Sequence, residues 1–242
     1  NKSIWSDNEE AVARYRAGLA LKGKSADEAA AEFNKALSAD SSFLAPKFEL
    51  GMIRMEKGDS QGALSYFQEI ASRVPFHGDA HLVVGQIHFE RKSYRDAVFH
   101  FGRALEFSMM GGETRYSVYL RRGTSHFKLG DYEQAGRDLD RALSFKLNRV
   151  EPFLLMSAIQ IKQEKYDDAL RSLENARRLK PEHTGILYQM GSIYYRQNDS
   201  RYAPLFEELF EKVRSRHQTA PAKYEKAMEI LAKKYFDEKK YQ

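Results

Sequence analysis

The sequence predicts an all-α fold in which antiparallel helix pairs repeat along the chain, and three observations support this. Small residues recur at a fixed spacing, because Gly51 and Gly85 are 34 residues apart, as are Ala63 and Ala97. Apolar residues within each repeat recur at i, i+4 and i+7, as they do on one face of a helix. The 15 Gly and 6 Pro in 242 residues are too few for an all-β fold, which needs a turn about every 8–12 residues.

Residues 1–43 form the first and least regular unit. The segment retains Ala17, Ala29, Phe33 and Ala36, and we expect its first helix to have lost the large aromatic residues of the later repeats. We therefore expect a degenerate repeat or a cap, with Trp5 packed over its end as an anchoring aromatic residue.

Five repeats follow, and their small residues keep the pattern in register. Gly85 and Gly123 are 38 residues apart because the segment "MMGG" adds four residues, and the spacing returns to 34 at Ser157 and Gly191. Between the two helices of a repeat, "KGDS", "KLGDY" and "QNDS" provide a Gly or Asn for a left-handed helix end, followed by a polar cap. The predicted repeats span residues 44–77, 78–111, 116–149, 150–183 and 184–214.

This pattern resembles the tetratricopeptide repeat (TPR), whose 34-residue unit has a Leu-Gly-x-x-Tyr core in one helix and an Ala-x-x-x-Phe core in the next. The resemblance covers nearly the whole chain. It implies that helix pairs stack into a right-handed superhelical solenoid with a concave and a convex side, because a single pair cannot bury its own apolar faces.

Residues 219–242 end the sequence with "LAKKYFDEKKYQ", which aligns Leu231 and Ala232 with the Leu-Gly pair. Two interpretations stay open: a solitary capping helix, or the first helix of a further, truncated repeat. The chain begins with Asn1, and both a cytoplasmic location and export after loss of a signal remain open.

Composition limits the possible functions. The chain is 42% hydrophobic and 30% charged with no cysteine, so it should fold without disulfides, thiolate-bound zinc or thiol catalysis. No apolar run reaches the roughly 18–20 residues of a membrane span. The net charge is +5, and the basic excess lies in residues 121–242, with 24 Lys and Arg against 18 Asp and Glu. Because acidic residues are interspersed among the basic ones, nucleic-acid binding is disfavoured.

The seven histidines form no recognisable metal-binding pattern. His88 and His126 occupy the usual Tyr position of the repeat and are expected to pack between helices. The acidic residues are expected in turns and on outward helix faces, among them Asp131, Asp138 and Asp140. No catalytic residue, metal site or cofactor is predicted, and we expect the chain not to be an enzyme.

A second stripe on the first helices suggests recognition. When the small residue of each repeat is numbered eight, positions five, nine and twelve lie on one face, about 100° from the packing stripe. In TPR proteins this face lines the concave groove, and neighbouring basic residues could pair with a carboxylate on the ligand. The predicted partner-binding groove consists of Phe48, Met52, Met55, Leu82, Gln86, Phe89, Leu120, Arg121, Thr124, Phe127, Leu154, Ile161, Lys162, Tyr188 and Tyr195.

A competing interpretation is that these residues pack against the next repeat. Five successive apolar rows exceed what stacking requires, which favours a groove for an amphipathic helix or an extended apolar peptide. One TPR subgroup grips a C-terminal carboxylate with Lys at position five and Asn at position nine. This sequence instead has Phe48, Leu82 or Leu120 at position five and Met52, Gln86 or Thr124 at position nine.

The sequence thus predicts a scaffold that binds another protein in an apolar concave groove. The alternative is a structural module that self-assembles through its end repeats. A nucleic-acid or anionic-surface binder, using basic residues such as Arg177, Lys180 and Arg214, is the least favoured hypothesis.

Overall fold

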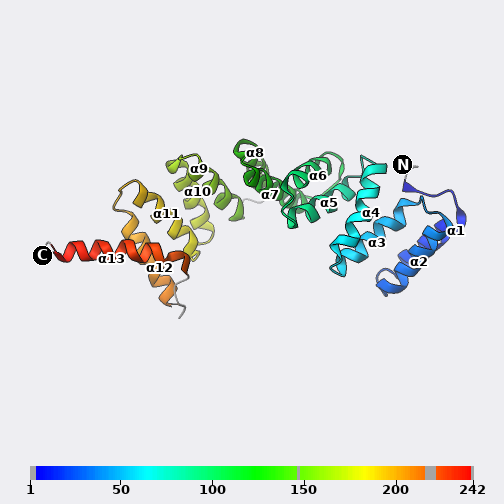
Figure 1. Cartoon of the computed structure of the whole chain (residues 1–242), viewed down its shortest axis with the longest axis horizontal. Helices are drawn as coiled ribbons and strands as arrows, with labels where there is room; N and C mark the ends of the chain where they lie inside the picture. The colour runs from blue at the N-terminus through cyan, green and yellow to red at the C-terminus, as the bar shows by residue number, and fades with distance from the viewer. Residues whose placement is uncertain (1–3, 146–147, 216–221, 241–242) are drawn as a thin grey trace. The chain divides into compact units, whose positions relative to one another are not determined.

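The computed structural model describes residues 4–145, 148–215 and 222–240, and these residues form helices and turns with no β-strand (Figure 1). The predicted fold class, an all-α solenoid of antiparallel helix pairs, is confirmed. The chain divides into two compact units, residues 1–138 and residues 139–242, which are described in turn. Every helix in the described ranges is too short or too polar to cross a membrane.

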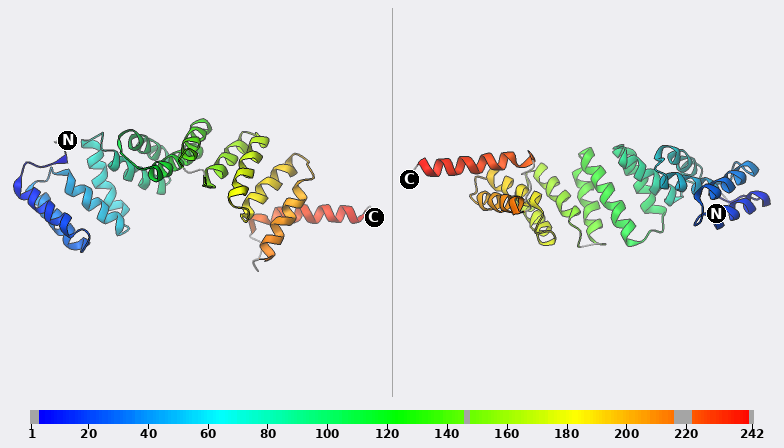
Figure 2. Two further views of the ribbon diagram at one scale, coloured as in Figure 1. Left: turned by 180° about the vertical axis from the view of Figure 1, so that it is seen from behind. Right: turned by 90° about the horizontal axis from the view of Figure 1, so that it is seen from below.

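In unit 1, each helix packs against the helices before and after it along the chain, from α1 to α7 (Figures 1 and 2). The helices of the unit are α1 (Glu9–Leu21), α2 (Ala26–Ala39), α3 (Leu44–Glu56), α4 (Ser60–Arg73), α5 (Gly78–Glu90), α6 (Tyr94–Phe107), α7 (Gly112–Leu129) and the first part of α8 (Tyr132–Leu143). The residues that follow Met110 in "MMGG" start α7, which is therefore longer than α3 and α5.

Unit 2 repeats this arrangement with α9 and α10 as one pair and α11 and α12 as the next. Its helices are the end of α8, α9 (Glu151–Lys162), α10 (Tyr166–Leu179), α11 (Thr184–Arg196), α12 (Tyr202–Ser215), the short 3-10 helix η2 (Ala222–Tyr224) and α13 (Glu225–Lys240). We call α1, α3, α5, α7, α9 and α11 the first helices of their pairs.

The small residues allow the two helices of a pair to approach closely. A Cβ atom added to Gly51 would lie 2.7 Å from the ring of Phe67, and one added to Gly85 would lie 2.8 Å from the ring of Phe101. Both rings are fully buried. Where Leu173 takes the place of the phenylalanine, Ser157 is accommodated and buried, and its hydroxyl donates to the Leu154 carbonyl (2.8 Å).

In the first helix pair, α1 and α2, the small residue that packs against the second helix is one position later than the sequence pattern predicts. The small residue against Phe33 is Gly18, whose added Cβ would lie 2.5 Å from that ring, whereas Ala17 is only half-buried. The reason is that Gly18 and Phe33 are 15 residues apart, one fewer than Gly51 and Phe67. The expectation that this first helix has lost its large aromatic residues is wrong, because Tyr15 of α1 is buried among the aromatic rings of the unit. The ring of Trp5 lies edge-on to Tyr15 with 5.9 Å between centroids, as expected for an anchoring aromatic residue.

Left-handed residues follow the first helices α3, α5, α7, α9 and α11, and three of them are the Gly or Asn that the turn sequences predict. Gly58, Gly130 and Asn198 have φ values of 80°, 83° and 54°, and the Asp59 carboxylate accepts a hydrogen bond from the Gly62 N–H (2.8 Å) to cap α4. The equivalent positions in the other two repeats, Lys92 and Glu164, are also left-handed although neither is Gly or Asn. The geometry of the turn therefore prevails over the preference of these side chains.

The expectation that Asp138 lies in a turn or on an outward helix face is wrong. The Asp138 side chain is 6% exposed, and both carboxylate oxygens accept from Arg122 on α7, at 2.8 Å and 2.6 Å. This fork-shaped ion pair joins α7 to α8.

Helix α13 is covered on only one side. Ala227 and Leu231 are buried against the preceding helices, as Ile186 and Met190 are in α11. Met228 is 49% exposed, whereas Leu187, at the equivalent place in α11, is completely buried. In α11 the neighbouring surface is covered by α12, and among the described residues no second helix covers it in α13.

The contact between Gly85 and Phe101 leads to a stability prediction. Gly85→Ser should lower the free energy of unfolding by about 1–3 kcal/mol, because its Cβ and hydroxyl overfill the space beside the ring. Adding Phe101→Leu should recreate the Ser157–Leu173 combination and make the double variant at least as stable as Gly85→Ser alone. Urea unfolding of the two single variants and the double variant measures this coupling, and strictly additive losses would contradict the packing described here.

Candidate functional site

The fifteen residues of the predicted groove have one property in common: none is fully buried. Lys162 and Tyr195 are exposed, and the other thirteen are half-buried. Their fully buried neighbours, such as Val84 and Ile87 in α5, point into the packed core. We call these fifteen residues the first-helix face, and describe it separately for each unit.

In unit 1 the face includes ten of these residues, on α3, α5 and α7. The Phe48 ring illustrates its dual character: it packs edge-on against Phe67, with 5.3 Å between centroids, and stacks on His77 at 5.4 Å, yet it stays partly exposed. The structure also brings Arg121 and Phe89 together, with the guanidinium carbon 5.6 Å from the ring centroid. Packing against neighbouring helices and partial exposure to solvent therefore coexist in the same residues.

In unit 2 two of the predicted residues meet at a cavity. Tyr188 and Tyr195 line a cavity of about 140 Å³ between α11 and α13, with the buried Phe206 of α12 contributing to its wall. Leu154, Ile161 and Lys162, all on α9, are not among its lining residues. The remaining lining residues are Ser192, Arg196, Lys226, Ala227 and Ile230.

Two cations of this cavity, Arg196 and Lys226, were missed by the sequence analysis. Arg196 follows position twelve of its repeat and was not counted as part of the stripe. Lys226 lies on α13, and the alignment of Leu231 and Ala232 with the Leu-Gly pair could have placed it at position two of a first helix. The alignment could thus have marked Lys226, but it could not show that Lys226 lies beside Arg196. The two residues line one cavity only because α11 and α13 are neighbours in the structure.

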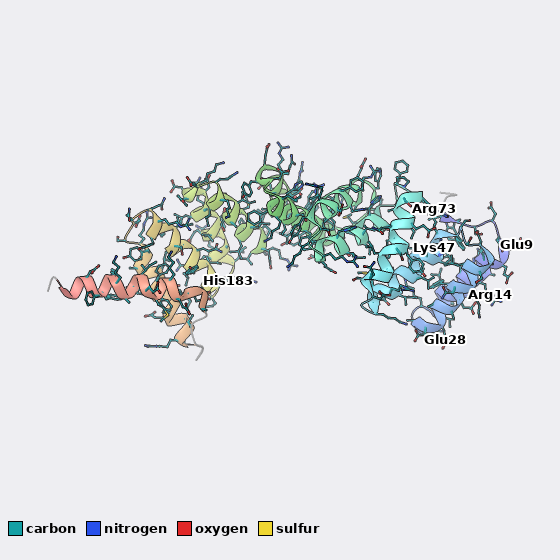
Figure 3. The ribbon with its side chains drawn as sticks, viewed as in Figure 1. Glu9, Arg14, Glu28, Lys47, Arg73 and His183 are labelled. Atoms are coloured by element: carbon teal, nitrogen blue, oxygen red, sulfur yellow. The ribbon has the colours of Figure 1, made fainter. Side chains whose placement is uncertain are left out.

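Some other cations on or beside the first helices are neutralised by acidic side chains. In unit 1, the Lys47 ammonium lies 2.6 Å from a Glu69 oxygen, and the Arg73 Nε lies 3.4 Å from the same atom (Figure 3). Arg14 likewise pairs with Glu32 at 3.4 Å. Within the part of the chain that the structure describes, Arg196 and Lys226 form no such ion pair.

A second cavity, of about 430 Å³, lies in unit 1 beside two neighbouring histidines. Its lining includes Phe99, which is 60% exposed, and the pair His81 and His100, whose Nδ1 atoms are 2.9 Å apart. The ring of His88 stacks on that of His100, with 5.7 Å between centroids. Among the described residues, no group of three or more His, Asp and Glu side chains has an arrangement that could hold a metal ion.

Burial sets the charge of these histidines. It lowers the pKa of His81, and it lowers the pKa of His100 to about 4, with a further contribution from the neighbouring His81 and His88. At neutral pH both rings are therefore uncharged and can share one hydrogen bond between their Nδ1 atoms.

Comparison with known families places the repeats in context. A family model described as "Tetratricopeptide repeat" matches residues 48–108 and 159–202, the segments whose helix pairs have just been described. The segments that it matches belong to the tetratricopeptide-repeat family, as the resemblance implies. A second model, described as "Anaphase-promoting complex, cyclosome, subunit 3", matches residues 90–176 of this chain.

Two curated relatives share parts of the TPR array. Cell division cycle protein 27 homolog A of Arabidopsis thaliana is 34% identical over 107 residues, which is 43% of this chain and 15% of that protein. The DnaJ homolog subfamily C member 7 homolog of Dictyostelium discoideum is 25% identical over 133 residues, 50% of this chain and 25% of that protein. The chain thus spans a quarter or less of the length of these two relatives.

Solved TPR structures share the fold. YrrB, described as "a TPR protein with an unusual peptide-binding site", has a TM-score of 0.64 at 19% identity, over 74% of this chain and 91% of that chain. A MamA structure from Desulfovibrio magneticus RS-1 has a TM-score of 0.61 at 19% identity, over 71% of this chain and 96% of that chain.

The pKa of His100 predicts a pH dependence of stability. Unfolded His100 takes up a proton near its ordinary pKa of about 6.5, whereas folded His100 does so only near pH 4. The unfolded state thus binds more protons between these values, so the free energy of unfolding falls as the pH drops from 6.5 towards 4. With allowance for solvent screening at this half-buried site, we expect His100 to account for a loss of about 1–2 kcal/mol over this range.

His100→Asn tests this, because Asn can retain a hydrogen bond to His81 without titrating. Urea unfolding at pH 6.5 and pH 4.5 should show a smaller loss of stability for the variant than for the wild type. His183→Asn, at an exposed position before α11 (Figure 3), is the control and should behave like the wild type. Equal pH dependence of all three proteins would refute the role assigned to His100.

Proposed function

We propose that this protein is a non-enzymatic scaffold that binds another protein through the first-helix face. The observation that carries the proposal is the alternation along each first helix. In α5, Val84 and Ile87 are fully buried, while Leu82 and Phe89 retain part of their surface on the adjoining stripe. Because half-exposed apolar residues recur on successive first helices, they form the kind of surface that usually marks a partner site.

The chemistry of the face suits an apolar peptide or an amphipathic helix. Met52 and Met55 have flexible, polarisable side chains that adapt to different ligand shapes. The Thr124 hydroxyl donates to the Leu120 carbonyl of its own helix (2.7 Å), which leaves its methyl group for apolar contact. Arg121, over the Phe89 ring, could pair with a carboxylate of the ligand. The peptide-binding site named for the structurally similar YrrB supports a peptide ligand here.

A second candidate function is self-assembly, which the one-sided packing of α13 favours. Met228 is 49% exposed and Phe236 is 71% exposed on a helix whose other side is buried. A second copy of the chain could cover these residues as α12 covers α11. Molar mass measured by light scattering over a concentration series tests this candidate, and a constant monomer mass would contradict it.

Binding should depend on the two aromatic residues of the first-helix face on α5 and α7. We expect Phe89→Ala combined with Phe127→Ala to weaken binding about tenfold or more, because large buried aromatic contacts dominate interface energies. The probes are fluorescent peptides selected from a displayed random library against the wild-type chain. Fluorescence anisotropy measures their affinity, and circular dichroism with urea unfolding tests whether the variant remains folded.

Phe99→Ala is the matched control, because Phe99 is an exposed phenylalanine on a second helix. It should leave peptide affinity unchanged. If the double variant unfolds, Phe89 and Phe127 belong to the core and the face is not a binding surface. If Phe99→Ala weakens binding as much as the double variant does, the partner site lies on the second helices instead.

A further inference from the structure

The cavity between α11 and α13 combines two features that together define a ligand. Its aromatic wall comes from Tyr188, Tyr195 and Phe206, and Ile230 adds an aliphatic surface. Its volume is about 140 Å³, close to the size of cavity that holds a benzene-sized group in a protein. The space therefore fits one large apolar side chain.

The second feature is positive charge without a partner. Arg196 and Lys226 line the same cavity, are exposed to solvent, and form no ion pair with an acidic side chain among the described residues. Some cations elsewhere in unit 2 are neutralised, because Arg177 lies 2.7 Å from Glu208 and Lys212 lies 2.7 Å from Glu182. Exposed cations such as Lys165 and Lys233 also form no ion pair with an acidic side chain in the part of the chain that the structure describes. What distinguishes Arg196 and Lys226 is therefore their place in the lining of the cavity. The two cations at the cavity are thus available to an anion from outside.

The charge of the whole unit acts in the same direction. Residues 139–242 contain 20 Lys and Arg against 15 Asp and Glu, whereas residues 1–138 contain 19 of each. The net charge of +5 therefore belongs entirely to unit 2. An acidic ligand would be attracted to this unit before it makes any specific contact.

We propose that this cavity is a subsite for an acidic peptide segment. A large apolar side chain of the partner enters the cavity, and Asp or Glu side chains beside it pair with Arg196 and Lys226. The arrangement differs from the carboxylate grip of other TPR proteins, because Tyr188 and Ser192 stand where that grip needs Lys and Asn. The inference rests on the proposed function. It adds that the ligand is negatively charged and that Arg196 and Lys226 recognise this charge.

Three peptides of equal length, each with one central Phe, test the subsite. The first has two Glu residues beside the Phe and an amidated C-terminus, the second has Gln in place of Glu, and the third has Gln with a free C-terminal carboxylate. We expect the 242-residue chain to bind the Glu peptide about tenfold more tightly than either Gln peptide in low salt, with the difference shrinking as salt is added. Fluorescence anisotropy measures all three affinities.

Arg196→Gln combined with Lys226→Gln should abolish the preference for the Glu peptide. The control Lys165→Gln combined with Lys233→Gln removes the same charge at two exposed positions outside the cavity lining, and it should keep the preference. Circular dichroism confirms that both variants are folded. If both double variants lose the preference for the Glu peptide equally, the preference depends only on the net charge of the chain, and the proposal of a subsite is wrong.

The remaining outcomes separate this inference from the proposed function. Equal affinity for the Glu and Gln peptides, while the library-selected peptides still depend on Phe89 and Phe127, overturns the acidic subsite and leaves the scaffold function intact. Preference for the free C-terminus assigns the cations to a terminal carboxylate and also overturns it. Tighter binding of a single-stranded oligothymidylate than of the Glu peptide would make unit 2 a nucleic-acid site instead.

Discussion

The structure depends on one close contact, between a small residue on the first helix of a pair and a buried phenylalanine or leucine on the second. Because a Cβ atom at Gly51 or Gly85 would lie less than 3 Å from the opposing ring, a larger side chain there must push the helices apart. The contact recurs in successive pairs and fixes how each pair is built. Stacking of the pairs then buries the alanine stripe of each second helix, as in α6 with Ala97 and Ala104.

This geometry divides each first helix into three faces. One faces its own second helix, one faces a neighbouring pair, and the third has no required partner within the stack. Helix α13 shows that the faces are independent, because it buries Ala227 and Leu231 while Met228 stays half-exposed. Functional specificity can therefore be added to the third face without disturbing the contacts that hold the pairs together. The unpaired Arg196 and Lys226 are an example of such an addition.

The sequence predicted the fold because every repeat obeys the same local rule, so that each occurrence supports the others. Where the rule varies by one residue, as between Gly18 and Phe33, the pattern pointed to the neighbouring Ala17. Residues whose role depends on contacts distant in sequence were harder to assign. Asp138 looked like a solvated acid because its partner Arg122 is on another helix. Arg196 and Lys226 could not be joined because only the packing of α11 and α13 brings them to one cavity.

Thiol labelling of single-cysteine variants tests the central claim most directly, since the natural chain has no cysteine. Met52→Cys and Leu82→Cys place a thiol on the first-helix face, whereas Ala63→Cys and Ala97→Cys place one in the packed stripe. We predict that the first two react with a maleimide in the folded protein, while the last two react only on unfolding. Protection of all four thiols would show that the first-helix face is core, and rapid labelling of Ala63→Cys and Ala97→Cys in stably folded protein would contradict the packing itself.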